Sequence, residues 1–319
     1  MATAPQQSAQ SDDKAGLISG LIAYTIWGLF PIYFVAMRHV PALELVSDRI
    51  VWSIPFGFLI LLFRKQIKET LHIFTKPKTI LLLALAATAM ASNWGVYIWA
   101  IQQGEIFQGS LGYYINPLIY VLVGVVFFKE KLSRLQGLAI VFAFIGVAIL
   151  TVKGGVFPGI SLFLAISFTI YGVFRKSIDV GAMPGLFVEV CVLFVPALAM
   201  LYYVSTHSGL AWGNVDTKTD ILIVLSGPLT VLPLLAFAFA ARRIPLSTLG
   251  ILQYVGPTLQ FACGIYFGEA FTTAHAWCFG LIWLGVALFA FDAIRRARLA
   301  AQPVCLTGNP QTNPRPDSQ

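Results

Sequence analysis

One arginine of this chain stands inside an otherwise apolar segment. Arg49 lies about two helical turns into the hydrophobic run 44–63, directly after Asp48, and Glu44 stands one turn before Asp48 on the same helix face. An arginine inside a membrane costs a few kcal/mol, so it normally faces a protein interior or a wet cavity and has a partner. Two roles are therefore open to Arg49. It binds or gates an anionic solute, or it forms a structural ion pair with Asp48 or another acid.

A single carboxylate interrupts the apolar segment 184–204. This residue, Glu189, follows Arg49 by about 140 positions. Acidic residues inside membrane segments are rare, and they mark proton relays, ion pathways or ligand counter-ions. Glu189 is accordingly a candidate proton-coupling group or cation ligand. The alternative is a neutral, hydrogen-bonded glutamate that fixes the contact between two helices.

Amide and aromatic side chains gather in three other apolar segments. Asn93 and Tyr97, for example, are four residues apart and share one helix face. Such a group can line a cavity for a partly apolar, partly polar or cationic solute; the alternatives are hydrogen bonds between helices and an aromatic belt at the membrane interface. Because Pro117 and Pro257 free backbone groups in two of these segments, we favour cavity lining for the whole set. The candidates are Asn93, Trp94 and Tyr97 in residues 79–101, Tyr113 and Asn116 in residues 108–128, and Gln253 and Tyr254 in residues 247–268.

A hydrophobic pattern occurs twice in the chain. The sequence YTIWGLF at 24–30 reappears as FTIYGVF at 168–174, and YINP at 114–117 has a counterpart, YVGP, at 254–257. An internal repeat in a membrane chain is typical of a transporter whose solute site lies between the two halves. Tyr24, Trp27 and Tyr171 of the first motif pair therefore join the candidate binding or gating residues.

The overall composition is that of a membrane protein. The chain of 319 residues is 58% hydrophobic and 11% charged, with a mean hydropathy of +0.80, whereas a soluble domain carries roughly 25% charged residues. There is room for ten membrane spans of about 20 residues each, and the ends, residues 1–14 and 296–319, have the composition of disordered tails. We expect an all-α integral membrane protein with spans near 15–37, 44–63, 79–101, 108–128, 133–152, 158–174, 184–204, 220–241, 247–268 and 273–292.

Lysine and arginine are distributed unequally between alternate loops. One set of loops and ends holds only Arg38, Lys153 and Lys218. By the positive-inside rule the other, richer set is cytoplasmic, which places both termini in the cytoplasm. Five spans per half is an odd number, so the second half must enter the membrane from the opposite side. The sequence therefore predicts two inverted five-helix repeats, at 15–152 and 153–295. The cytoplasmic set is Lys14, Arg64, Lys65, Lys68, Lys76, Lys78, Lys129, Lys131, Arg134, Arg175, Lys176, Arg242, Arg243, Arg295, Arg296 and Arg298.

Several classes of site have no support in the sequence. No Walker motif, dinucleotide fingerprint, HExxH or GxSxG occurs, so we expect no cofactor and no catalytic residue. The four cysteines form no CxxC pair and the histidines do not cluster like ligands, so we expect no metal site. The net charge of +7 reflects short loops beside a membrane, and no nucleic-acid partner is expected.

Several segments resemble one known family. VPALE at 40–44, DRIVWS at 48–53, NW at 93–94, YIWA at 97–100, SLGYYINPL at 110–118 and KEKLS at 129–133 are similar to the RarD family, as are ARRIPLSTLG at 241–250, QY at 253–254 and PTLQF at 257–261. That family belongs to the EamA group of the drug/metabolite transporter superfamily. The resemblance implies a ten-helix carrier of the bacterial inner membrane with five-plus-five inverted repeats, and it favours export. The family usually has a histidine where this chain has Asp48, which implies a different charge preference or proton handling if that position lies in the cavity.

We therefore expect a secondary transporter, embedded in the lipid bilayer, that moves small metabolites, amino-acid-like solutes or drugs by alternating access, with protons as the candidate coupling ion. The alternative is a membrane-embedded interaction or sensory protein without transport activity, which is weaker because the sequence has no soluble signalling or docking domain. An intramembrane enzyme would need a reactive constellation such as paired aspartates. No residue pattern assigns an oligomeric state.

Overall fold

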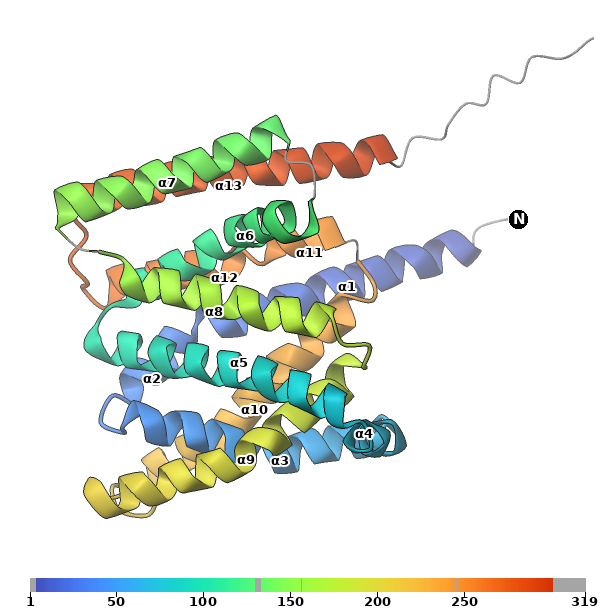
Figure 1. Cartoon of the computed structure of the whole chain (residues 1–319), viewed down its shortest axis with the longest axis vertical. Helices are drawn as coiled ribbons and strands as arrows, with labels where there is room; N and C mark the ends of the chain where they lie inside the picture. The colour runs from blue at the N-terminus through green and yellow to red at the C-terminus, as the bar shows by residue number, and fades with distance from the viewer. Residues whose placement is uncertain (1–3, 130–132, 156, 245, 301–319) are drawn as a thin grey trace, which may run out of the picture.

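The computed structural model describes residues 4–129, 133–155, 157–244 and 246–300, and within these ranges it contains helices and no strand. The order of the helices along the chain can be followed in Figure 1. They are α1 (Ala4–Gly28), α2 (Phe30–Ala36), α3 (Ala42–Phe63), α4 (Ile67–Phe74), α5 (Pro77–Gln103), α6 (Ile106–Phe128), α7 (Arg134–Gly154), α8 (Gly159–Lys176), α9 (Ala182–His207), α10 (Thr217–Ala240), α11 (Leu246–Leu252), α12 (Val255–Tyr266) and α13 (Thr273–Ala300).

Nine of the ten predicted spans are long and apolar enough to cross a membrane, counted over the residues that the structure describes. The first combines α1 with α2, and the others are α3, α5, α6, α7, α8, α9, α10 and α13. The predicted span 247–268 instead forms two shorter helices, α11 and α12, which separate at Gln253 and Tyr254. Pro257 accounts for this break, because it has no N–H group to donate to the Gln253 carbonyl and its ring crowds that carbonyl.

The first span is also irregular, between Gly28 and Phe30. Pro31 lacks the N–H group that would bond to the carbonyl of Trp27. Gln260 of α12 donates its Nε2 to that carbonyl at 3.3 Å, so a side chain replaces the missing backbone bond. A buried carbonyl in a membrane needs such a partner, because no water is present to supply one. The amide of α12 thereby stabilises the kink between α1 and α2.

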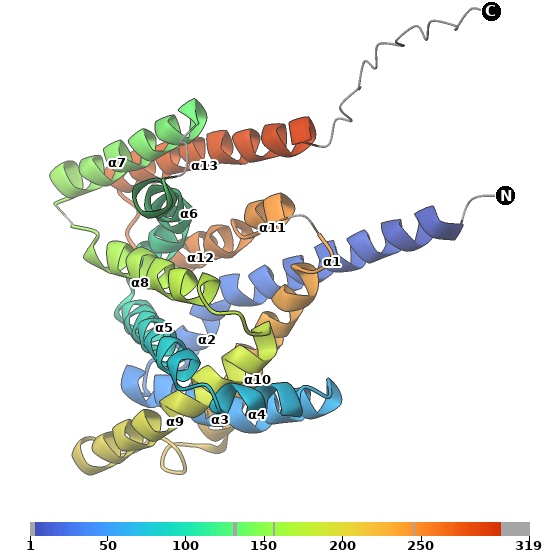
Figure 2. The same cartoon turned by 45° about the vertical axis from the view of Figure 1, so that its right-hand side comes forward.

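The helices pack in pairs that occur twice. α1 packs on α10 as α5 packs on α8, and α1 packs on α12 as α6 packs on α8. α7 and α13 lie along each other at one edge of the molecule, while α3, α9 and α10 contact one another at the opposite edge (Figures 1 and 2). Most of these pairs join a helix before residue 153 to a helix after it. The junction between the two sequence halves therefore runs through the middle of the molecule.

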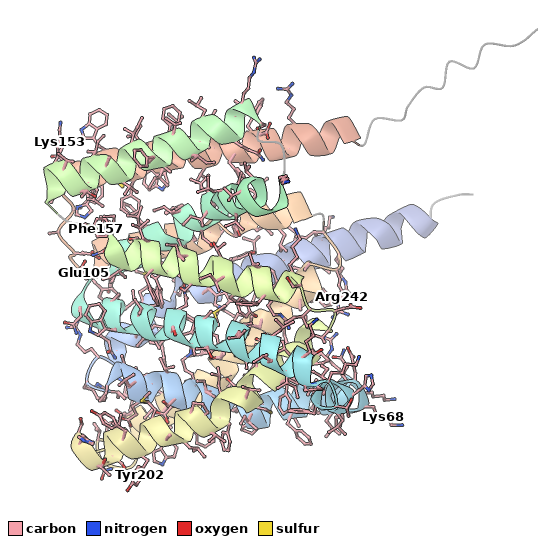
Figure 3. The ribbon with its side chains drawn as sticks, viewed as in Figure 1. Lys68, Glu105, Lys153, Phe157, Tyr202 and Arg242 are labelled. Atoms are coloured by element: carbon pink, nitrogen blue, oxygen red, sulfur yellow. The ribbon has the colours of Figure 1, made fainter. Side chains whose placement is uncertain are left out.

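The loops gather at the two ends of the helices. Figure 3 shows Lys68 and Arg242 at one end, and Glu105 and Lys153 at the other. α1 begins and α13 finishes at the end that carries Lys68 and Arg242 (Figures 1 and 2). The loops of the set rich in Lys and Arg therefore lie at one end of the helices, and the loops of the poorer set lie at the other end, as the sequence predicted.

The connecting and terminal segments contain helical structure beyond the predicted spans. α1 begins at Ala4 and α13 ends at Ala300, so residues 4–14 and 296–300, which we expected to be disordered, continue the terminal helices. Extending a helix that has already nucleated requires little further free energy. The loop at 64–76 contains the short helix α4, whose Ile73 is buried against α9. Lys131 of the cytoplasmic set and the tail residues 1–3 and 301–319 lie outside the described residues.

Candidate functional site

A cavity of about 440 Å³ lies between the helices of the two halves. Its wall combines residues of α1, α2, α3, α5, α6, α8, α9, α10 and α12 with Gln253 at the break between α11 and α12. Asp48, Asn93 and Tyr254 are the candidates that do not line it. The other candidate residues all do: Tyr24, Trp27, Arg49, Trp94, Tyr97, Tyr113, Asn116, Tyr171, Glu189 and Gln253.

Arg49 is buried in α3, with 4% of its surface exposed, and contributes to the cavity wall. Its Nε donates a hydrogen bond to Oγ1 of Thr230 in α10 at 3.0 Å. The guanidinium carbon lies 4.6 Å from the ring centre of Trp94 and 5.4 Å from that of Phe30. Both distances allow cation–π attraction. The aromatic faces therefore offset part of the free energy that burial of this charge requires.

Arg49 has no acidic partner among the described residues, where the single salt bridge within 4.0 Å joins two other groups. Asp48 is buried outside the cavity wall, and its Oδ2 has no hydrogen-bond partner in the protein. Successive residues of a helix point about 100° apart, so the two neighbours face different surroundings. The predicted alternative, a structural Asp48–Arg49 ion pair, is not formed. An anion that enters the cavity meets a guanidinium with no carboxylate already bound.

The other acid of this segment, Glu44, is used in packing. Its Oε1 accepts the N–H groups of Ala211 and Trp212, at 2.7 and 3.2 Å, from the loop between α9 and α10. Glu44 is fully buried, and hydrogen bonds to a carboxylate are stronger than those between neutral groups. The residue therefore holds this loop against the first turn of α3.

Glu189 is the acid of the cavity, and α8 supplies both of its partners. The carboxylate is 3% exposed on α9. Its Oε1 lies 3.4 Å from Nη1 of Arg175, and its Oε2 accepts the hydroxyl of Tyr171, also at 3.4 Å. Arg175 and Tyr171 stand one turn apart on α8, so one helix face meets both oxygens. Arg175 entered the sequence analysis only as one of the positive residues of the cytoplasmic loops, and its pairing with Glu189 was not predicted.

The two charges lie toward opposite ends of the cavity. α3 and α9 run in opposite directions (Figure 1), and Arg49 and Glu189 each stand seven residues after the start of their helix. At 1.5 Å per residue each charge is about 10 Å from its own end of the bundle. Because α3 has 22 residues, the backbone positions of the two charged residues are separated by roughly 10 Å along the helix axes. The space between them is walled largely by aromatic rings.

Asn93 and Tyr254 support the wall without forming it. Asn93 is fully buried; its Nδ2 donates to the Leu164 carbonyl at 2.8 Å and to Ser167 Oγ at 2.9 Å, and its Oδ1 accepts the Tyr113 hydroxyl at 3.2 Å. These bonds join α5, α6 and α8, and they orient one tyrosine of the wall. Tyr254 stacks on a tyrosine of α6 with ring centres 6.2 Å apart. For both residues the packing alternative describes the contacts in the structure.

Several wall residues were absent from the prediction, among them Phe168, Thr230 and Phe237. Phe168 occupies the position of Tyr24 in the second copy of the repeat, so the repeat itself was a usable signal. Thr230 is a polar residue between two prolines of an apolar helix, which is a second usable signal. Phe237 packs on Trp27 with ring centres 5.9 Å apart. A phenylalanine in a hydrophobic span has no feature that separates it from lipid-facing residues.

The loop between α12 and α13 contacts the start of α6, at the end of the molecule opposite to Lys68. Oε2 of Glu269 accepts the N–H of Phe107 at 2.8 Å, which caps the first turn of α6. Glu105 lies nearby in the loop before α6. Burial raises the pKa of Glu269 to about 7; the N–H of Phe107 opposes this shift, and the negative charge of Glu105 adds to it.

The raised pKa of Glu269 makes part of the stability depend on pH. The folded protein keeps this proton up to about pH 7, whereas an unperturbed carboxyl group loses it near pH 4.5. The folded state thus binds more protons between these values, and the free energy of unfolding falls as pH rises through them. Glu269→Gln cannot ionise and should lose this part of the slope. In thermal unfolding in detergent, the Tm of the wild type should fall relative to that of the variant as the pH rises from about 4.5 to about 7. The same dependence of Tm on pH in both proteins would count against the assignment.

The chain is similar over nearly its whole length to several bacterial membrane proteins. The EamA-like transporter family matches residues 14–152. An uncharacterised transporter of Pseudomonas aeruginosa is 40% identical over 296 residues, which cover 92% of this chain and 99% of the other. Protein RarD of Streptomyces exfoliatus is 35% identical, with 96% and 99% covered, and protein RarD of Escherichia coli is 36% identical, with 89% and 97% covered.

The arrangement of the helices also has a counterpart among solved proteins. One crystal structure of a protein superposes on this chain with a TM-score of 0.61, covering 88% of this chain and 99% of the other. The two sequences are 18% identical. At this level the likeness concerns the fold alone, and the site has to be interpreted from the residues of this chain.

Proposed function

The chain belongs to the RarD family of EamA-type membrane transporters, and on that premise we propose which kind of transport it performs. It is a secondary carrier that exports small metabolites, amino-acid-like solutes or drugs across the bacterial inner membrane by alternating access. Residues 15–152 and 153–295 act as inverted halves, both termini are cytoplasmic, and the cavity between the halves is the solute site.

One observation carries this proposal: a single cavity holds a carboxylate toward one end and, toward the other, a cation that has no acidic partner within the described part of the chain. Arg49 binds the anionic group of the solute and Glu189 the cationic group, while aromatic rings such as Tyr97 and Trp27 contact the apolar part. A solute long enough to span roughly 10 Å contacts both charges at once. A shorter zwitterion passes from one charge to the other.

The arrangement of the helices supports alternating access. Reciprocal packing of α1 on α10 and α5 on α8 is the pattern that two inverted five-helix units produce. The break between α11 and α12 places backbone groups freed by Pro257 beside the lining residue Gln253. Discontinuous helices of this kind occur at solute sites of carriers, because non-helical backbone in a membrane is tolerated where it borders a cavity.

Glu189 is the proposed coupling group. A carboxylate between two halves that rock can take up a proton on one side and release it on the other. Its neighbours Arg175 and Tyr171 keep it solvated by protein groups when no solute is bound. Export driven by the proton gradient would follow from exchange of a proton for the solute at this residue.

Flux into proteoliposomes tests the proposed function. Purified protein is reconstituted and screened with amino acids, small peptides and hydrophobic drugs, with and without an imposed pH gradient, against empty liposomes. The proposal expects saturable uptake of at least one solute and a change in its rate when the gradient is imposed. Absence of flux for the whole panel would instead favour an interaction or sensory protein.

Thr230→Val provides a graded test of the Arg49 site. The substitution keeps the volume of the side chain but removes the oxygen that accepts the Nε hydrogen bond. Losing one hydrogen bond of about 1 kcal/mol should raise the KM for a transported anion or zwitterion about fivefold. The maximal rate should change little, because the guanidinium remains. An unchanged KM in the flux assay would mean that Thr230 does not orient the arginine.

A further inference from the structure

The pair formed by Arg175 and Glu189 differs from an ordinary helix-to-helix ion pair. The nearest charged atoms are 3.4 Å apart, and neither Nη1 of Arg175 nor Oε1 of Glu189 has a hydrogen bond of good geometry in the protein. Both atoms are nevertheless buried. The contact is therefore close enough to neutralise the carboxylate without being a tight, bidentate bridge.

The two side chains of the pair border different surroundings. Glu189 lines the cavity, together with Tyr171 and Leu186, whereas Arg175 does not. The side chain of Arg175 is 18% exposed and that of Glu189 is 4% exposed. Arg175 stands in the last turn of α8, just before the loop to α9. The arginine thus lies between the cavity and the loop end of the bundle, with the carboxylate on the cavity side.

The opposing helix has a slot for the guanidinium. Gly185 precedes Glu189 by one turn on α9, and a Cβ atom at Gly185 would collide with the Arg175 guanidinium group. The arginine therefore lies directly over the backbone of α9, and it can do so because this position has no side chain. The ion pair with Glu189 and the close packing on Gly185 together place the Arg175 side chain across the contact between α8 and α9.

We infer that Arg175 is the closing residue at this end of the cavity and that it competes with the solute for Glu189. A buried carboxylate that has neither a cation nor a proton is costly, so Glu189 requires a positive partner whenever it is ionised. When a cationic group of the solute takes that place, a second cation beside it is repelled. Arg175 can then move outward at little cost, because its side chain already reaches solvent. The closure opens only when Glu189 has another partner, and this inference rests on the proposed carrier function.

Thiol accessibility tests the closure directly. A single cysteine replaces Leu186, which lines the cavity, in a chain whose Cys191, Cys263, Cys278 and Cys305 are changed to alanine. A membrane-impermeant maleimide is applied to inside-out and right-side-out vesicles. Arg175→Gln and Gly185→Ala should raise the labelling rate from one side only by about fivefold, the effect expected for loss of one partly buried pair. Arg175→Lys keeps the charge and should label close to the wild-type rate.

A double-mutant cycle separates a pair from two independent effects. Arg175→Gln combined with Glu189→Gln should label no faster than either single variant, because both remove the same contact. Unchanged labelling in Gly185→Ala, which keeps every charge, would overturn the inference even if Arg175→Gln fails to fold. Rates that multiply in the double variant would overturn it as well.

Labelling and flux together distinguish a failure of the proposed closure from a failure of the proposed carrier function. Accessibility that increases in the variants while no solute is transported would support the closure and contradict the carrier. Transport with normal saturation but with accessibility unaffected by Arg175 would retain the carrier and contradict the closure.

Discussion

Arg49→Ala is expected to lower transport at least tenfold while the protein still inserts and folds. The guanidinium lines the cavity and has no acidic partner among the residues placed by the structure. A hydrogen-bonded charge pair with a solute anion contributes about 1.5–3 kcal/mol, or about 10- to 150-fold in affinity. Its removal leaves no carboxylate unpaired, so the free energy of unfolding should not fall through loss of an ion pair. Flux and thermal unfolding of the same preparation provide the measurement.

Two variants provide controls for Arg49→Ala. Asp48→Asn alters the charge one position earlier on α3 but outside the cavity wall, so flux should stay near the wild-type level. Arg49→Lys keeps a positive charge but loses the planar contact with Trp94 and the Nε bond to Thr230, so it should recover transport only in part. Normal flux in Arg49→Ala, or equal loss in Asp48→Asn, would contradict the assignment.

Glu189→Gln is expected to abolish transport driven by a pH gradient. The amide is nearly isosteric but cannot take up a proton or balance a cationic solute. Arg175 would lose its partner, yet its partial exposure to solvent limits the effect on stability. The measurement is initial uptake with and without the gradient. We expect at least a tenfold loss, because a hydrogen bond between the carboxylate and a cationic group of the solute contributes about 1.5–3 kcal/mol.

Tyr171→Phe is the matched control for Glu189→Gln. It removes the hydroxyl that donates to Oε2 and leaves the ring in the wall. A modest fall in rate with retained gradient dependence is expected, since the carboxylate and Arg175 both remain. Gradient-driven uptake that survives in Glu189→Gln would show that another group carries the proton.

The site was predictable where a polar residue interrupts an apolar pattern. Arg49 and Glu189 were found in this way, and the structure places both on one cavity. The repeat and the prolines led to Tyr24, Trp27 and Gln253 for a similar reason, since they mark irregular backbone between two halves. Such signals depend on the sequence pattern alone and need no knowledge of which helices meet.

The part of the candidate site that the sequence did not predict depends on side-chain direction and on contacts between distant segments. Asp48 was assigned with Arg49 because the two are neighbours in sequence, yet only one of them reaches the cavity. Asn93 has the chemistry of a solute ligand, but its amide is used between α5, α6 and α8. Arg175 was counted as a topological charge, because its partner lies on another helix. To predict each of these outcomes one must know how each helix is oriented about its own axis, and the sequence pattern does not specify that orientation.

The fold shows the same division. Nine spans were predicted from the length of their hydrophobic segments. The remaining segment, 247–268, is interrupted by a break between α11 and α12 that Pro257 could have indicated. The helix α4 lies in a loop that was recognised only by its charge, and its 8 residues are fewer than the window of about 11–18 residues over which helical periodicity is usually assessed. The capping of α6 by Glu269 joins residues 162 positions apart and leaves no local trace.

The most direct measurement compares zwitterions with their neutralised derivatives in proteoliposomes. Amino acids and dipeptides of increasing charge separation are tested beside their N-acetyl and methyl-ester forms, each with an imposed pH gradient. If opposite charges at the two ends of one cavity bind the solute, zwitterions are taken up, and loss of either charge lowers uptake about tenfold or more. Equal uptake of the zwitterion and both derivatives, unaltered by Arg49→Ala, would contradict the account.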